Sequence, residues 1–234
     1  MKRLILSVLL LLPLLVVAQE PLLTPQQMPN SVHFLPPPPD TASAHFRYDV
    51  SQYRWGKAQR ADSARLAMAL RDAVWGLQTI CEEYSVPVGF SITEKETPAI
   101  YRMLCTAILS TDQARVLPKR HYMRIRPYAF FGEPTIYPAD EAELRTDGSY
   151  PSGHTIRGWV AALLLVELCP DKADAILARG YEFGQSRVIA GYHWQSDVDA
   201  ARLVASAAVA RIHADKRFQK LMKKAKREAR RVRN

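Results

Sequence analysis

The chain has 234 residues, of which 48% are hydrophobic, 24% charged and 9% aromatic, with 16 prolines against 10 glycines. This composition is typical of a globular protein long enough for one domain with a substantial core, and it excludes collagen-like and disordered chains. Three cysteines, Cys81, Cys105 and Cys169, are too few and too scattered for a structural zinc site or a disulfide-stapled mini-protein, and their spacing leaves open whether Cys81 and Cys105 pair.

The formal charge of +9 is concentrated at one end of the chain. Residues 216–234 carry ten Lys or Arg side chains against one acidic side chain, whereas residues 19–215 carry 20 basic and 22 acidic ones. The body of the protein is therefore not basic, and the net charge does not mark it as a nucleic-acid-binding domain.

Residues 1–18 have the layout of a secretory signal peptide: two cations, an apolar stretch, and small residues before a cleavage point after Ala18. A membrane anchor is the alternative, but an apolar run of about 14 residues is shorter than the ~20 that span a bilayer, and Pro13 interrupts it. We expect a periplasmic or secreted protein with no transmembrane segment after signal removal.

Residues 19–58 contain seven prolines, four of them in the run 36–39, and show no helical period. Proline fixes φ and withholds a backbone donor, so this stretch predicts an extended arm on the body.

Beyond residue 59, apolar residues recur at spacings of three and four, which predicts helices. The expected helices cover residues 64–80, 97–116, 155–168, 171–188 and 196–213, the last one capped by Ser196. The helix over 155–168 is apolar on most sides and should be central. The predicted fold class is all-α: a single helical-bundle domain over residues 59–215, with the Pro-rich arm before it and a basic tail after it.

Two segments do not fit the helical pattern. Residues 128–150 form a long connection without a clear period, which is more often a functional lid or rim than filler. The tail, residues 216–234, is polar almost all round and predicts a solvated helix or a disordered end. A solubilising charge run is the favoured interpretation of the tail, with contact to anionic surfaces as the alternative.

Two of the six histidines have unusual neighbours. His154 follows Ser152 and Gly153 immediately before the central helix, where free backbone N–H groups attract anions. His193 precedes Asp197 by four residues, a spacing at which the carboxylate can accept a hydrogen bond from one ring nitrogen and leave the other free.

Residues 119–126 hold four cations without a balancing acid, including Lys119 and Arg126. An exposed basic loop would explain this cluster alone. Together with the Ser-Gly-His turn and Arg187, it predicts a phosphate site, because a guanidinium offers a planar fork to a tetrahedral oxyanion and Lys adds a compact charge.

These residues carry a resemblance to a known family. The motifs are Lys119-x6-Arg126-Pro127, then Pro151-Ser152-Gly153-His154, then Ser186-Arg187-x5-His193-x3-Asp197. Their order and spacing resemble the signature of the superfamily of type-2 phosphatidic acid phosphatases and vanadium haloperoxidases. The sequences of residues 148–155 and 184–199, the Pro-rich arm and the signal peptide are similar to those of the class A bacterial non-specific acid phosphatases. The resemblance covers roughly residues 30–213 and leaves out the tail.

The resemblance implies roles for these positions. His193 would be the nucleophile of a phosphohistidine intermediate, oriented by Asp197, and His154 would be the general acid and then the base. Lys119, Arg126 and Arg187, with the Ser152 hydroxyl and the Gly153 N–H, would hold the phosphate oxygens. No metal and no cofactor are implied, and the partners would be small organic phosphate monoesters.

Physical reasoning adds an expectation about pKa values. Cations around His154 should lower the pKa of that ring, and Asp197 should raise the pKa of His193. Activity should therefore favour acidic pH, where His154 is charged.

Three other functions are compatible with parts of the sequence. A serine hydrolase using Ser152 would need a Gly-x-Ser-x-Gly elbow, which is absent. A vanadate-dependent haloperoxidase would use the same anion cradle, although the chain is short for one. A helical binding protein would use its basic tail on anionic surfaces. The preferred substrate, the balance of hydrolysis and phosphotransfer, and a homo-oligomeric state are left open.

Overall fold

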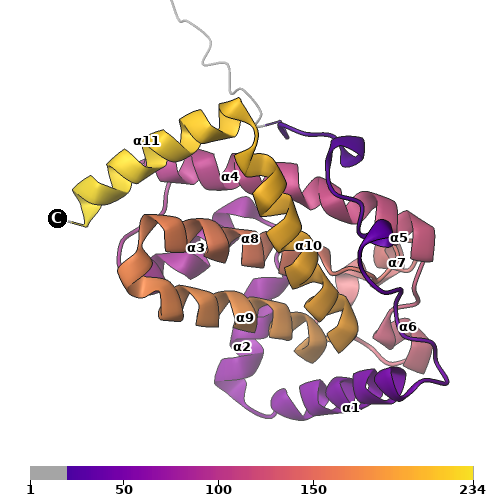
Figure 1. Ribbon diagram of the computed structural model, residues 1–234. Coiled ribbons are helices and arrows are strands. Elements are labelled where there is room, and N and C mark those ends of the chain that lie inside the picture. Colours follow the sequence, from indigo (N-terminus) through magenta and orange to yellow (C-terminus); the bar gives the residue numbers. More distant parts are fainter. Residues whose placement is uncertain (1–19, 234) are drawn as a thin grey trace, which may run out of the picture.

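The computed structural model describes residues 20–233, so the expected signal peptide, residues 1–18, lies outside the described residues. Within this range the chain forms helices and no strand, which confirms the all-α prediction (Figure 1). No helix in the described range is long and apolar enough to cross a membrane. The α-helices are α1 (Ala44–Gln59), α2 (Ser63–Ala73), α3 (Leu77–Val88), α4 (Pro98–Asp112), α5 (Val116–Tyr122), α6 (Pro127–Phe131), α7 (Glu141–Leu144), α8 (Gly153–Leu168), α9 (Ala173–Ile189), α10 (Gln195–His213) and α11 (Lys216–Val232). The 3₁₀ helices are η1 (Pro25–Gln27), η2 (Ser31–His33), η3 (Gln113–Arg115), η4 (Pro138–Asp140) and η5 (Pro170–Lys172).

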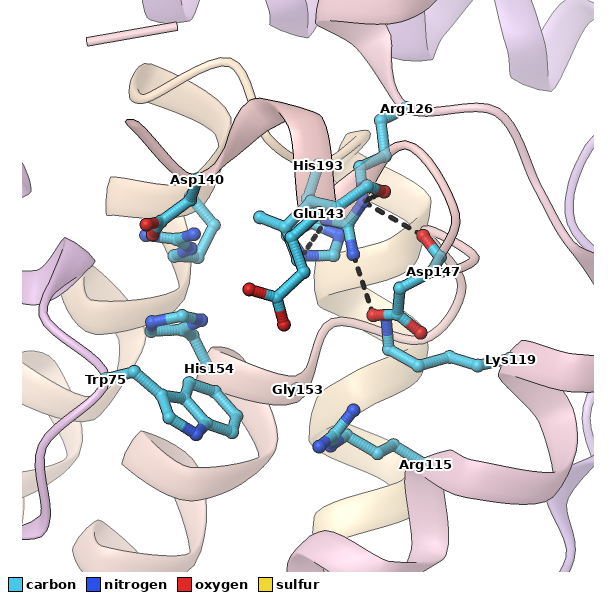
Figure 2. Close-up of a pocket in the computed structure, with 12 residues that line it drawn as sticks. Trp75, Arg115, Lys119, Arg126, Asp140, Glu143, Asp147, Gly153, His154 and His193 are labelled. Carbon is cyan, nitrogen blue, oxygen red and sulfur yellow. Dashed lines mark hydrogen bonds and ion pairs between the residues drawn. The ribbon is translucent and has the colours of Figure 1, made fainter. Parts of the chain in front are cut away.

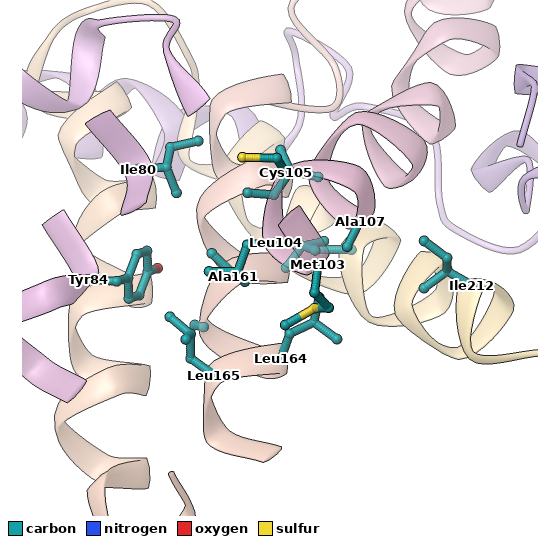
Figure 3. Packing of buried hydrophobic residues seen from close by; sticks show 14 of the residues in the cluster. Ile80, Tyr84, Met103, Leu104, Cys105, Ala107, Ala161, Leu164, Leu165 and Ile212 are labelled. Atoms are coloured by element: carbon teal, nitrogen blue, oxygen red, sulfur yellow. The ribbon is translucent and has the colours of Figure 1, made fainter. Parts of the chain in front are cut away.

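Helix α8 lies at the centre, as its apolar sequence predicts, and packs against α9, α10, α4 and α3 (Figure 1). Figure 3 shows part of the core between these helices, in which Leu104 of α4, Leu164 of α8 and Ile212 of α10 are all fully buried. Burial of each such side chain contributes about 1.5–3 kcal/mol.

The α8–α9 pair is close because two glycines face the partner helix. A Cβ on Gly158 would lie 2.5 Å from the ring of Phe183, and one on Gly180 would lie 2.7 Å from Ala162. The hydroxyl of Tyr84 donates to the carbonyl of Gly158 at 2.6 Å. This close contact positions both the N-terminus of α8 and the C-terminus of α9.

The three cysteines are buried free thiols. A hydrogen bond between the Cys81 and Cys105 side chains, together with burial, raises the pKa of Cys81. The two thiols are therefore neighbours that are not joined in this structure.

The prediction of an extended arm over residues 19–58 is wrong in its second half. Residues 20–43 contain only the turns η1 and η2, but α1 begins at residue 44 with Ser43 accepting a hydrogen bond from the Phe46 N–H. The last proline of the stretch is Pro39, and Phe46, Asp49 and Tyr53 line one buried face of α1. The proline density of the first half concealed this helix.

The single helix expected over residues 64–80 is two helices. Val74 is extended, with ψ 124°, and Gly76 is the N-cap of α3. The break leaves the Ala73 carbonyl at the end of α2 without a helical partner and places Trp75 between the helices. Both groups contact His154.

The tail is not polar all round. Phe218, Met222 and Ala225 follow one stripe of α11, and all three are buried against α4 and the core (Figure 1). Glu228, the one acid of the tail, accepts a hydrogen bond from the Ile100 N–H at 2.8 Å and so caps α4. The charge run masked this apolar stripe, and the helix belongs to the folded domain.

This packing makes the tail necessary for stability. We expect Phe218→Ala to lower the free energy of unfolding by about 3–5 kcal/mol, because it leaves a cavity between α11 and α4. Lys223→Ala on the exposed face of the same helix is the matched control, expected within about 0.5 kcal/mol of wild type. Urea unfolding followed by circular dichroism measures both, and equal stability of the two variants would contradict the assignment.

Candidate active site

A cavity of about 300 Å³ opens where the N-terminus of α8 meets the segment before α6 and the turn between α9 and α10. Six of the eight residues predicted from the sequence line it: Lys119, Arg126, Gly153, His154, Arg187 and His193 (Figure 2). Asp197 lies behind His193 and is fully buried.

Backbone hydrogen bonds hold the three motifs together. The Ser149 N–H donates to the Arg124 carbonyl at 2.9 Å, which joins the first motif to the second. The Ser152 N–H donates to the Asp197 carbonyl at 3.1 Å, which joins the second to the third. These two hydrogen bonds hold the three motifs side by side, as the resemblance implies.

The contacts of His193 determine which of its nitrogens carries the proton. Arg126 Nη1 lies 3.1 Å from Nε2, and because a guanidinium can only donate, Nε2 is the acceptor. The proton is then on Nδ1, which lies 3.3 Å from Asp197 Oδ2 and donates to it. The Nε2 lone pair of His193 therefore accepts from Arg126, on a ring that lines the cavity.

The pKa of His193 differs from the expectation. Burial and the charge of Arg126 lower it to about 3, and Asp197, which acts in the opposite direction, does not compensate. The prediction of a raised pKa was wrong because it counted the carboxylate and not the desolvation. The ring is neutral above this pH and keeps its lone pair.

Asp197 is held by groups from several elements. It accepts from the Ser149 hydroxyl, from the Trp194 N–H at 2.9 Å and from Arg124, whose other nitrogen pairs with Asp49 of α1 at 2.7 Å. Burial alone would raise the pKa of Asp197, but the charge of Arg124 and these hydrogen bonds hold it well below its usual value. The carboxylate is therefore an ionised, immobile acceptor for His193.

His154 is positioned by the break between α2 and α3. Its Nε2–H donates to the Ala73 carbonyl at 3.1 Å, so the lone pair of the neutral ring is on Nδ1. The ring packs edge-on to Trp75, with centroids 4.4 Å apart, and Arg157 covers the same indole at 3.2 Å. Burial, followed by the charges of Arg187 and Arg157, lowers the pKa of His154 well below its usual value, in the expected direction.

Lys119 and Arg126 share a carboxylate that the sequence analysis did not select. Asp147 Oδ2 lies 2.8 Å from Lys119 Nζ and 3.1 Å from Arg126 Nη2 (Figure 2). Burial and the charge of Arg126 lower the pKa of Lys119 to about 7, and Asp147 acts against this. Asp147 thus helps to keep Lys119 charged.

Arg187, unlike Lys119 and Arg126, forms no ion pair with a carboxylate among the described residues. Its side chain is 1% exposed, and its Nε and Nη1 have no hydrogen-bond partner among residues 20–233. The guanidinium lies 4.6 Å from the ring centre of Tyr192, and burial lowers its pKa to about 10. A buried guanidinium with free N–H groups on a cavity wall is an anion-binding group.

The N-terminus of α8 completes the cavity. A Cβ at Gly153 would lie 2.8 Å from Cδ of Arg115, so a larger residue would require the Arg115 side chain to move. The Ser152 hydroxyl accepts from the Thr155 N–H at 3.4 Å and is fully buried as the N-cap. In this structure Ser152 therefore stabilises the helix end that faces the cavity.

Sequence reasoning missed Trp75, Asp49, Arg115, Asp140, Glu143 and Asp147. Asp147 stands one residue before the Gly-Ser-Tyr-Pro-Ser-Gly-His stretch, and this adjacency was an available signal. Asp49 lies in α1, which was predicted to be extended, and Trp75 lies in the break between α2 and α3, which was predicted to be helical. The sequence held no signal for either residue. Within residues 20–233, no three or more His, Cys, Asp or Glu side chains form a metal-binding group.

Comparison with known proteins agrees with this geometry. Residues 100–220 match the PAP2 superfamily. The non-specific acid phosphatase of Providencia stuartii is 48% identical over 200 residues, covering 85% of this chain and 80% of that protein. The non-specific acid phosphatase of Salmonella typhimurium is 41% identical over 210 residues (89% and 84%), and an acid phosphatase of Zymomonas mobilis is 34% identical over 200 residues (86% and 75%).

The chain belongs to the PAP2 superfamily, among the class A bacterial acid phosphatases. This confirms the family expected from the motifs, and it confirms the expectation of a phosphatase. The matched region includes the first turn of α11, which the resemblance had left outside.

The pairing of Asp147 with Lys119 predicts a change in the pH dependence of anion binding. Asp147→Asn removes a charge that raises the pKa of Lys119, so Lys119 loses its proton at a lower pH in the variant. Inhibition by inorganic phosphate should then weaken between pH 5 and pH 8 several-fold more steeply than in wild type. Asp174→Asn, an exposed acid on α9, is the control. Parallel pH profiles for the Asp147 variant and wild type would refute the pairing.

Proposed function

We propose that this protein is a metal-independent acid phosphatase that hydrolyses small organic phosphate monoesters through a phosphohistidine intermediate. The observation that carries the proposal is the neutral His193, whose ring lines the same cavity as His154 and Arg187 and whose Nε2 accepts from Arg126. A bound phosphate would take over the Arg126 N–H and free the Nε2 lone pair for attack.

The phosphoryl group would bind at the cations. Arg187 supplies free N–H donors, Lys119 and Arg126 supply charge, and the N-terminus of α8 at Gly153 supplies a backbone N–H and the positive end of the helix. Neutralising the three non-bridging oxygens and holding the ester in line are the main requirements of phosphoryl transfer.

In the first step, His193 Nε2 attacks phosphorus, the P–N bond forms and the bond from phosphorus to the ester oxygen breaks. The Nδ1–H bond to Asp197 stabilises the positive charge that develops on the ring. His154 donates a proton to the departing alkoxide. A phosphate dianion beside Arg187 offsets the charge that lowers the pKa of His154, so substrate binding favours the protonated acid.

In the second step, His154 takes a proton from water, the oxygen attacks phosphorus and the P–N bond breaks. Inorganic phosphate leaves, and His193 returns to its neutral form with the proton on Nδ1. An alcohol in place of the water would give phosphotransfer by the same route. Acidic pH favours both a charged Lys119 and a protonated His154.

Two further parts of the proposal concern specificity and location. Among the residues that line the cavity, Trp75 and Leu144 are the ones with large apolar side chains that could recognise a particular alcohol, which supports broad specificity. The leader over residues 1–18 supports a periplasmic or secreted location.

Substitution of the two histidines separates their roles. His193→Ala should abolish turnover, because no nucleophile replaces Nε2. His154→Ala should slow alkyl phosphates by about 10²–10⁴-fold and p-nitrophenyl phosphate far less, because nitrophenolate leaves without a proton. Steady-state kinetics on both ester types measures the difference, and equal losses would refute the acid role of His154.

The intermediate itself can be trapped. Rapid quenching of wild type with ³²P-labelled substrate should give an acid-labile, base-stable adduct, absent in His193→Ala. Turnover without such an adduct under conditions in which the second step is limiting would refute the covalent mechanism.

A further inference from the structure

The mouth of the cavity carries acidic side chains that the mechanism does not use. Asp140 at the end of η4 and Glu143 of α7 line the same cavity as His154 and Arg187. Figure 2 shows the Glu143 carboxylate directed into the centre of the cavity and the Asp140 carboxylate above His154. They come from the segment 128–150, whose length and lack of a period predicted a rim.

Neither carboxylate is held by a direct partner, although the charge of Asp140 acts on Arg187 and raises the pKa of that guanidinium against the effect of burial. Among residues 20–233, the side chains of Asp140 and Glu143 form no ion pair and no hydrogen bond. Asp147 differs, since it pairs with both Lys119 and Arg126. Lys119 and Arg126 thus have a counter-charge in Asp147, and Asp140 and Glu143 form no ion pair of their own.

The segment that carries these acids is fastened to the body. The Glu141 carboxylate accepts from the Thr135 N–H at 2.7 Å, and the Tyr128 hydroxyl donates to the Glu141 carbonyl at 2.8 Å. The Ile136 N–H donates to the Ala190 carbonyl at 3.2 Å, at the end of α9. These contacts use Glu141 for anchoring and leave Glu143, on the same short helix, to point into the cavity.

The position of the phosphoryl group relative to this rim follows from Arg187. Its unpartnered, fully buried guanidinium marks the place of the anion at the base of the cavity. In-line attack by His193 sends the ester oxygen away from that ring, toward the side of His154. The alcohol part of the substrate must then extend toward the mouth, where Asp140 and Glu143 lie.

We propose that Asp140 and Glu143 determine specificity by charge: they favour monoesters of neutral or cationic alcohols and disfavour esters whose alcohol carries a second anionic group. This inference rests on the proposed phosphatase function. Amino-alcohol phosphates are the favoured class, and phosphorylated hydroxy acids, bisphosphates and nucleoside polyphosphates are the disfavoured one.

The sign of the effect follows from the charges that face the alcohol. Arg115, the remaining cation on the cavity wall, pairs at 2.9 Å with Asp112, a carboxylate that also pairs with Arg157 at 3.2 Å. An ammonium group at the mouth gains attraction from two carboxylates, while a carboxylate or phosphate there is repelled. Each interaction, screened by water at an open mouth, changes kcat/KM by a few-fold, on the order of fivefold.

The test compares three alkyl monoesters of similar size at pH 6 and low ionic strength. O-phosphoethanolamine has a cationic alcohol, glycerol 3-phosphate a neutral one and 3-phosphoglycerate an anionic one. Wild type should show kcat/KM decreasing in that order. In the double variant Asp140→Asn/Glu143→Gln, the ratio between the first and the last ester should fall on the order of tenfold.

Ratios within one variant do not depend on the fraction of protein that is folded, so partial misfolding does not obscure the result. Glu94→Gln, an exposed acid that does not line this cavity, is the matched control and should keep the wild-type ratio. Raising the salt to about 0.5 M should lower the wild-type ratio toward that of the double variant, because unpaired charges at an open mouth are screened.

The outcomes separate the two proposals. A wild-type protein that hydrolyses p-nitrophenyl phosphate but treats the three alkyl esters alike, or prefers 3-phosphoglycerate, would overturn the charge selection and leave the phosphatase function intact. An unchanged ratio in the double variant would also overturn it. A protein that hydrolyses none of these esters would overturn the proposed function itself.

Discussion

The concentration of buried positive charge around two histidines is the constraint on which the rest of the site depends. Lys119, Arg126 and Arg187 are each at most 4% exposed, and all three line one cavity. Removing such charges from water costs several kcal/mol each unless an anion compensates. Asp147 compensates two of them, and Arg187 forms no ion pair among the described residues. The proposed binding of a phosphate would supply the anion that Arg187 lacks.

The same charges set the protonation of the histidines. His193 faces Arg126 on one side and Asp197 on the other, so the donor-only guanidinium and the ionised carboxylate together dictate a neutral ring with its lone pair on Nε2. His154 lies near Arg187 and Arg157 and resists protonation until an anion arrives. In the proposed mechanism, one electrostatic field would make the first ring a nucleophile and the acidity of the second dependent on substrate.

Helix ends, and not helix faces, supply the geometry. The end of α2 offers the Ala73 carbonyl to His154, and the start of α8 offers N–H groups at Gly153. The turn between α9 and α10 carries His193. The close contact of α8 with α9, which the glycines permit, brings these ends to one place. Figure 2 shows the result, in which side chains from elements distant in sequence enter a single cavity.

The sequence by itself determined the helical class, the central place of α8 and most of the site residues, because apolar periodicity and motif spacing are local properties of the chain. Only the tertiary structure decided the pKa of His193, the pairing of Asp147, the helix over residues 44–59 and the buried stripe of α11. Each of these depends on what packs around a residue. Desolvation outweighs the neighbouring Asp197 at His193, and the surface of α4 makes a stripe in a strongly basic helix part of the core. A linear pattern records which side chains are present, but burial, which sets the strength of each charge, comes from elements far away in the chain.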